Sequence, residues 1–146
     1  MPELPEVENV RMSLTSLGIE GQRIAKVELL RADLRVPFPP RIAERLRGQR
    51  LRSIRRRAKY LLFETEEFFM LNHLGMTGSW RSWQDSRKHD HVILHFASGL
   101  KLVFNDPRRF GMLDLVRKDE LSRSRWLQHL GVEPLSDDFN ADFLFA

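Results

Sequence analysis

Alternating apolar and polar residues, broken by short turn sequences, run through the chain between about residue 23 and residue 116. Successive side chains of a β-strand point to opposite faces, so a period of two predicts strands that each bury one face. The alternation is clearest at residues 24–29, 51–55, 91–96 and 100–104. Residues 60–64 and 68–71 are denser apolar runs, which predict strands buried on both faces. Six to eight short strands in under a hundred residues predict a mainly β fold, an antiparallel sandwich or barrel.

Short connectors and flanking helices complete this prediction. Ser98 and Gly99 are typical of a two-residue hairpin turn. Residues 2–17 place four apolar side chains on one helical stripe: Val7, Val10, Leu14 and Leu17. Gly18 then ends this helix, and a short helix is predicted around residues 42–46, ended by Gly48. Asp119 is expected to cap a third helix, in which three leucines line one side: Leu121, Leu127 and Leu130.

Length and composition exclude several classes of protein. The chain has 146 residues, enough for one ordinary domain, and its apolar fraction of 42% allows a real core. No run approaches 18 apolar residues and the N-terminus is acidic, so neither a membrane span nor a secretory signal is expected. With 0 cysteines these residues contain no disulfide, thiol nucleophile or cysteine-ligated zinc. The expected location is the cytoplasm.

The formal net charge of +4 conceals a concentrated basic segment. Residues 41–59 contain nine arginines and lysines and one acid, Glu44. Such a surplus favours a polyanionic partner, because each neutralised phosphate releases condensed counterions. A solvated basic surface is the alternative, and a membrane surface is disfavoured because the segment lacks a helical apolar stripe.

The first residues suggest a nucleophile. Removal of Met1 leaves Pro2 with a free secondary amine, and an α-amino group has a pKa of roughly 7.7–8.0, so a neutral fraction exists near pH 7. A neutral secondary amine attacks an aldehyde or acetal carbon and gives a cationic iminium, and the neighbouring Glu3 could move protons. The alternative is that Pro2 only begins a helix whose dipole is complemented by nearby glutamates.

Five ordered segments together resemble the N-terminal half of bacterial formamidopyrimidine-DNA glycosylases, the 8-oxoguanine repair enzymes. They are residues 2–8 (PELPEVE), 56–62 (RRAKYLL), 73–78 (HLGMTG), 88–91 (KHDH) and 106–111 (DPRRFG). Residues 130–140 extend the resemblance, and Leu4 favours this branch over the endonuclease VIII group, which usually begins PEGPE.

The resemblance implies a two-sheet antiparallel β-sandwich flanked by helices, with the catalytic proline on the N-terminal helix. It also implies a bifunctional glycosylase and AP lyase acting on double-stranded DNA with oxidised purines or abasic sites. The Pro2 nitrogen would attack the sugar C1′ of the flipped nucleotide, and elimination would then cut the strand. In this scheme Glu3 matches the acid/base carboxylate, Glu6 a supporting one, and Lys59 a lysine of phosphate contact and proton transfer.

The resemblance also assigns residues that bind DNA. Base flipping leaves a gap that costs a few kcal/mol unless it is filled. Met76, Arg108 and Phe110 match the residues that fill this gap, and His73 and His89 match positions that meet the DNA backbone. For His91 a structural role is expected, as is packing for the three tryptophans, Trp80, Trp83 and Trp126.

The family's C-terminal helix–two-turn–helix domain and four-cysteine zinc finger have no counterpart in this sequence. We therefore expect residues 1–134 to be the catalytic β-sandwich domain and residues 135–146 the start of a linker. No cofactor is expected in this chain, since the family's one zinc binds the finger. A monomer with little turnover is expected, and duplex affinity near the non-specific range of about 10⁻⁴–10⁻⁶ M at physiological salt.

Three other functions fit the same residues. A non-catalytic basic β-domain would bind DNA or RNA through residues 41–59. An endonuclease VIII-like enzyme would prefer oxidised pyrimidines. An interaction domain would dock a partner chain through its aromatic segment at residues 139–145.

Overall fold

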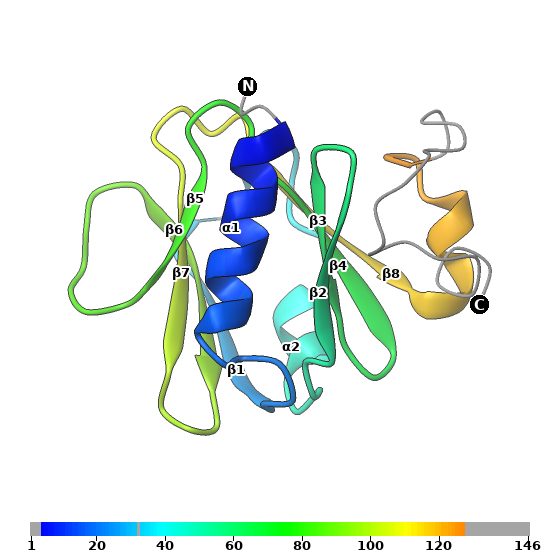
Figure 1. The fold of residues 1–146 in the computed structure, drawn as a ribbon, viewed down its shortest axis with the longest axis horizontal. Coiled ribbons are helices and arrows are strands. Elements are labelled where there is room, and N and C mark those ends of the chain that lie inside the picture. Colours follow the sequence, from blue (N-terminus) through cyan, green and yellow to red (C-terminus); the bar gives the residue numbers. More distant parts are fainter. Residues whose placement is uncertain (1–3, 32, 128–146) are drawn as a thin grey trace.

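The computed structural model describes residues 4–31 and 33–127, which form two four-stranded antiparallel sheets (Figure 1). The first sheet has the order β1-β6-β7-β5: β1 (Ile24–Leu29), β6 (Asp90–Phe96), β7 (Lys101–Asn105) and β5 (Ser79–Ser82). The second has the order β2-β3-β4-β8: β2 (Ser53–Arg57), β3 (Tyr60–Glu64), β4 (Phe68–His73) and β8 (Met112–Arg117). This confirms the two-sheet sandwich that the resemblance implied.

The main core fills the space between the sheets. Side chains alternating inward from both sheets are fully buried there, among them Ile54, Leu61, Phe63, Leu102 and Phe104. Helix α1 (Leu4–Ser16) lies along the opening between the sheets and contacts β2, β3 and β5 (Figure 1). It buries Val7 and Leu14, as its apolar stripe predicts. The short helix α2 (Ile42–Leu46) packs on β1 through Ile42 and Leu46.

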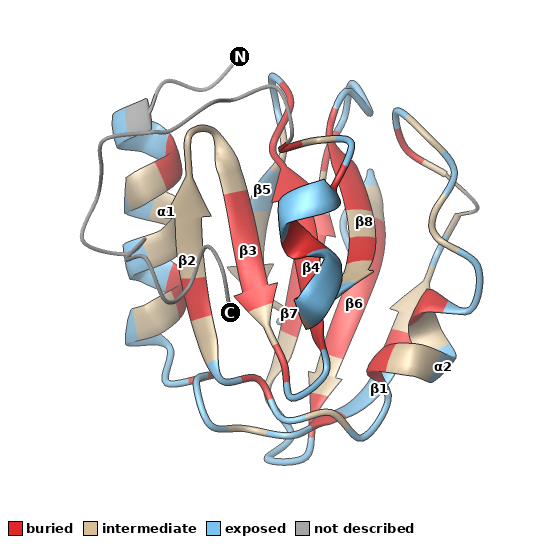
Figure 2. Ribbon diagram, turned by 90° about the vertical axis from the view of Figure 1, so that its right-hand side faces the viewer, coloured by how far each residue is buried: buried red, intermediate tan, exposed pale blue. Residues whose placement is uncertain are grey.

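A second apolar layer covers the outer face of the second sheet. Leu62, Phe69, Leu71 and Met112 pack there with Leu121 and Leu127. Leu121 belongs to the 3₁₀ helix η1 (Lys118–Arg123), which lies over β4 and β8 (Figure 2). Strand β4 is therefore buried along its whole length on both faces, which confirms the prediction from its dense apolar run.

Three local expectations are wrong. Leu17 is 41% exposed, because α1 ends at Ser16 and Leu17 lies in the turn that follows the helix. The loop between β6 and β7 spans residues 97–100 and is longer than the predicted two residues, with Gly99 at φ +98°. Asp119 lies inside η1, which begins after the extended Arg117 without a side-chain cap. Leu130 and residues 135–146 lie outside the described residues.

The strand register gathers several loops at one end of the sandwich. Arg57, Tyr60, His73 and Met112 form one row across the second sheet, and Ser79, Asn105 and Asp90 form one across the first. The β2–β3 turn, the β4–β5 turn and the β7–β8 loop all leave from these rows, and the β5–β6 loop enters there. Helix α1 begins at the same end (Figure 1). We call it the loop end.

Candidate functional site

The loop end carries six of the predicted site residues. Lys59 is in the β2–β3 turn, His73 ends β4, Met76 is in the β4–β5 turn, His89 precedes β6, and Arg108 and Phe110 are in the β7–β8 loop. Glu6 is exposed in the first turn of α1. Pro2 and Glu3 lie outside the described residues.

A hollow of about 460 Å³ brings part of this set together. Its lining is Arg35, His73, Gly75, Met76 and Phe110. Met76 and Phe110 are each 45% exposed, so two large apolar side chains project beside the hollow with no core to bury them. The guanidinium of Arg108 lies 5.1 Å from the centre of the Phe110 ring. Three of the predicted DNA-binding residues therefore lie side by side.

His73 is a neutral, buried imidazole that lines this hollow. Burial is the main cause that lowers its pKa below the ordinary 6.5, and the positive charges of Arg35 and Lys59 lower the pKa further. Its Nδ1 accepts the Gly75 N–H at 2.9 Å, which places the proton on Nε2 in the neutral ring. The rings of Tyr60 and His73 meet in a T-shaped contact, with centroids 5.0 Å apart and planes at 70°. His73 thus offers an N–H donor, Nε2–H, that adds no positive charge to the site.

The β4–β5 turn and the β7–β8 loop meet backbone to backbone. A Cβ on Gly75, whose φ is +65°, would lie 2.5 Å from Gly111 N. A Cβ on Gly111 would lie 2.8 Å from both Asp106 Oδ2 and His73 O. Side chains at these two positions would push the loops apart, so this close approach of the two backbones depends on glycine at both.

Asp106 connects three of the site's loops. Its carboxylate accepts the Thr77 hydroxyl at 2.6 Å and the Gly111 N–H at 2.8 Å. Its carbonyl oxygen lies 2.7 Å from His91 Nε2, and its N–H donates to His89 O at 3.1 Å. His91 is buried in this contact, in line with its expected structural role.

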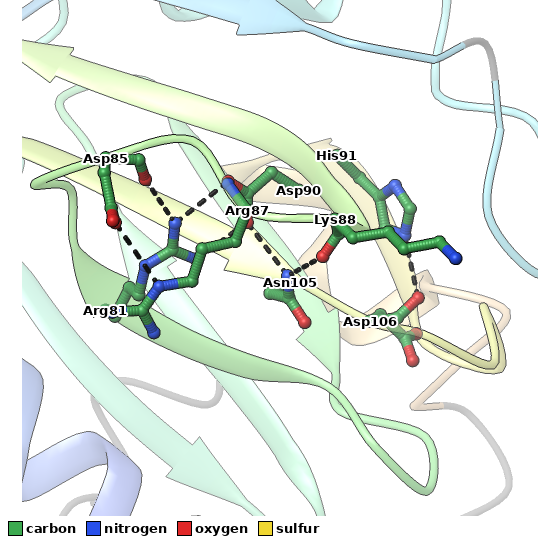
Figure 3. A network of polar contacts seen from close by, with 8 residues as sticks. All are labelled: Arg81, Asp85, Arg87, Lys88, Asp90, His91, Asn105 and Asp106. Atoms are coloured by element: carbon green, nitrogen blue, oxygen red, sulfur yellow. Dashed lines mark hydrogen bonds and ion pairs between the residues drawn. The ribbon is translucent and has the colours of Figure 1, made fainter.

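A second network holds the β5–β6 loop that carries His89 (Figure 3). Arg81 forms a bidentate pair with Asp90, at 2.7 and 2.9 Å. Asp90 also accepts the Arg87 N–H and the Asn105 amide, which in turn donates to Lys88 O. These donors and the Arg81 charge outweigh desolvation and lower the pKa of Asp90 to about 2. The network fixes the loop on both sides of His89, which is exposed at φ +72°.

Arg35 is a site residue that the sequence analysis missed. Its N–H donates to Gly111 O at 3.1 Å, and its guanidinium lies 5.8 Å from the centre of the Trp126 ring. It also lines the hollow and acts on the pKa of His73. The sequence gives one sign of this role, an arginine that lies between Leu34 and Val36 and outside the basic segment 41–59.

The basic segment 41–59 does not form one face. Arg41 pairs with Glu44, Arg55 with Glu64 and Arg56 with Glu8. Helix α2 packs on β1 of the first sheet, and residues 50–53 lie at the end of the second sheet opposite the loop end, since Ser53 pairs with Glu64 and Arg57 with Tyr60. Only the last residues of the segment reach the site.

The three tryptophans take part in packing contacts, as expected. Trp80 lies between Phe63 and Phe104 and donates to Asn72 Oδ1 at 2.9 Å. Trp126 donates to Asp114 Oδ2 at 2.7 Å, and Lys101 lies 4.7 Å from the centre of the Trp83 ring.

The sequence model of the formamidopyrimidine-DNA glycosylase N-terminal domain matches residues 1–113. The chain belongs to this family. Similar curated proteins include the formamidopyrimidine-DNA glycosylases of Bdellovibrio bacteriovorus and Acinetobacter baylyi, each 50% identical over 99% of this chain. Those matches cover 54% and 53% of the two relatives, so the chain spans about half the length of the curated relatives it matches.

Solved structures of this family share the fold. Lactococcus lactis Fpg in complex with DNA containing an abasic site has a TM-score of 0.81 and 33% identity, over 95% of this chain and 53% of that one. The same enzyme with DNA containing a Fapy-dG lesion gives a TM-score of 0.81 and 34% identity, over 94% of this chain and 53% of that one. The comparisons confirm the resemblance drawn from the five motifs.

The residues of this chain do not fit the cysteine-ligated zinc of the resemblance, because the sequence has 0 cysteines. Within residues 4–31 and 33–127, no group of three or more His, Asp or Glu side chains could hold a metal ion. No helix in the described part of the chain is both long and apolar enough to cross a membrane.

Proposed function

We propose that the chain is the N-terminal catalytic half of a bifunctional DNA glycosylase and AP lyase that removes oxidised purines. Its substrate would be double-stranded DNA with 8-oxoguanine, formamidopyrimidine or abasic sites, and residues 1–134 would be the catalytic domain. The observation that carries this proposal is the grouping of Met76, Arg108 and Phe110 beside a hollow with a cation and a neutral imidazole, at the end where α1 begins.

In the proposed reaction the Pro2 nitrogen attacks C1′ of the flipped nucleotide and the oxidised base leaves with a proton from the site. The ring-opened product is an iminium between Pro2 and C1′. Loss of a proton from C2′ then expels the 3′-phosphate in β-elimination, and a second elimination expels the 5′-phosphate. Glu3 would transfer protons at the sugar, supported by Glu6, and Lys59 would contact phosphate and assist β-elimination.

DNA recognition is assigned to side chains of the loop end. Met76, Arg108 and Phe110, which we call the wedge, would enter the gap left by the flipped nucleotide. Phe and Met suit insertion between base steps, and Arg108 can hydrogen-bond the orphaned base. His73 would donate Nε2–H to a backbone phosphate, Arg35 would supply charge beside it, and His89 would meet the backbone from the β5–β6 loop.

Borohydride trapping tests this proposal. The chain is mixed with a duplex carrying an abasic site or 8-oxoguanine opposite cytosine, and the iminium is reduced to a stable amine. We expect an adduct on the abasic duplex that peptide mapping places on Pro2. The matched control is chain that retains Met1, which has no free Pro2 amine and should not trap there. Binding without any adduct from Met1-free chain would contradict the catalytic assignment and leave a DNA-binding domain.

The lesion duplex separates further outcomes. An adduct on the 8-oxoguanine duplex would show base excision by this chain alone and overturn the expectation of little turnover. A preference for oxidised pyrimidines over 8-oxoguanine would instead support the endonuclease VIII-like function.

A further inference from the structure

We infer that Thr77 and Asp106 are positioning residues that assemble the wedge before DNA arrives. This inference rests on the proposed function, because it assigns a role to the geometry of the proposed wedge. The wedge side chains come from two separate loops, and the inference concerns what holds those loops in one arrangement.

The hydroxyl of Thr77 is the junction between the two loops. It donates to Asp106 Oδ1 at 2.6 Å and accepts the Arg108 N–H at 3.2 Å. The other carboxylate oxygen of Asp106 accepts the Gly111 N–H at 2.8 Å. Thr77 directly follows Met76, and Arg108 and Gly111 lie on either side of Phe110. All three wedge residues are therefore within two residues of a bond made by this pair.

Asp106 makes a firm anchor because it is fully buried. A buried carboxylate is costly unless its oxygens are hydrogen-bonded, and both oxygens are occupied by the two loops. None of the ion pairs among the described residues includes Asp106. Its own N–H and carbonyl oxygen are held by His89 and His91. Its orientation is therefore determined by the same loops that it holds together.

The wedge side chains have little else to order them. Met76 and Phe110 are each 45% exposed, so core packing does not select their positions. Loops that are ordered only on binding lose affinity through the entropy of ordering. A hydrogen-bond network that fixes both loops before binding removes that entropic cost. It thereby preserves selectivity for DNA in which a base is missing from the stack.

Thr77→Val tests the inference, because it keeps the branched shape and removes only the hydroxyl. We expect Kd for a duplex with a tetrahydrofuran abasic analogue to rise about tenfold, the effect of one hydrogen bond to a charged group. Kd for the undamaged duplex should not change, so the preference for the abasic-analogue duplex falls. Thr77→Ser restores the hydroxyl and should restore the preference. In a chain that already carries Phe110→Ala, Thr77→Val should have a smaller effect.

Thr65→Val is the matched control. Thr65 is buried at the opposite end of the sandwich, and its hydroxyl contacts Gln49 and accepts the Phe68 N–H at 3.1 Å. This variant should lower stability without changing the ratio of the two Kd values. Amide hydrogen exchange supplies a readout independent of DNA: Thr77→Val should speed exchange at Arg108 and Gly111, and Thr65→Val should not.

The outcomes separate the inference from the proposed function. Suppose that wild-type chain traps and binds the abasic-analogue duplex more tightly than the undamaged duplex. If Thr77→Val then keeps the wild-type ratio of the two Kd values, the inference is wrong and the proposed function stands. Trapping by a chain that shows no preference for the abasic-analogue duplex over the undamaged duplex would also overturn the inference. If wild-type chain does not trap while Thr77→Val speeds amide hydrogen exchange at Arg108 and Gly111, the proposed function fails and the Thr77–Asp106 hydrogen bonds have only a structural role.

Discussion

Gly75 shows how a single residue determines the shape of the site. Its φ of +65° disfavours any side chain, and a Cβ there would lie 2.5 Å from Gly111 N. We expect Gly75→Ala to lower the free energy of unfolding by roughly 3 kcal/mol, from backbone strain and overpacking together. Gly99→Ala is the control, since its φ is +98° but nothing lies within 4 Å of the added Cβ. Equal losses for the two variants in urea denaturation would contradict the close approach of the loops.

His73 makes a prediction about pH at the same scale. Its pKa is lowered in the folded chain, chiefly by burial, so between the folded pKa and about 6.5 the unfolded chain binds more protons. Stability should therefore fall as the pH drops below about 6.5 and stop falling below the folded pKa. In urea denaturation between pH 7.5 and 5, His73→Gln should lose less stability than wild type. A parallel loss would show that other groups account for the pH dependence.

Among the elements, β4 was the easiest to predict and β5 the hardest. The apolar run at the start of β4 is a local signal, because two cores need apolar residues at every position. Strand β5 has only four residues, Ser79–Ser82, on the edge of its sheet, and just Trp80 packs against the core. A pattern that short has no detectable period. Register, which brings His73 and Met112 into one row, is a tertiary property that no local pattern contains.

Strand β4 also yields the prediction at this scale. Met70 points into the main core and Leu71 into the outer layer, and both are buried. We expect Met70→Ala and Leu71→Ala each to lower the free energy of unfolding by roughly 2–5 kcal/mol. Leu30→Ala, at a residue that is 46% exposed, should change it by less than about 0.5 kcal/mol. A small effect of Leu71→Ala alone would mean that the outer layer does not stabilise the fold.

For the molecule as a whole, the candidate site could be predicted from motifs far better than from charge. The five motifs contributed Lys59, His73, Met76 and the β7–β8 loop, which the fold brings to one end. The surplus of charge in residues 41–59 favoured a polyanionic partner without locating its binding surface, and folding spreads the segment away from one face and pairs several of its arginines with glutamates. Arg35 was missed because its role depends on contacts with distant residues, Gly111 and Trp126.

This distribution of charge predicts a shallow dependence of DNA binding on salt. Each phosphate contact contributes a slope of about −0.9 in log K against log salt, so the two cations assigned to the DNA backbone, Arg35 and Lys59, should give roughly −2. Lys59→Gln should make the slope shallower by about 1. Arg52→Gln removes an exposed charge of the same basic segment next to Ser53, at the opposite end, and should leave the slope unchanged. The measurement is Kd for the abasic-analogue duplex over a salt series, at salt concentrations low enough for the protein to saturate the duplex. An equal change of slope in both variants would mean that DNA contacts the whole segment 41–59, and that the binding surface is not confined to the loop end.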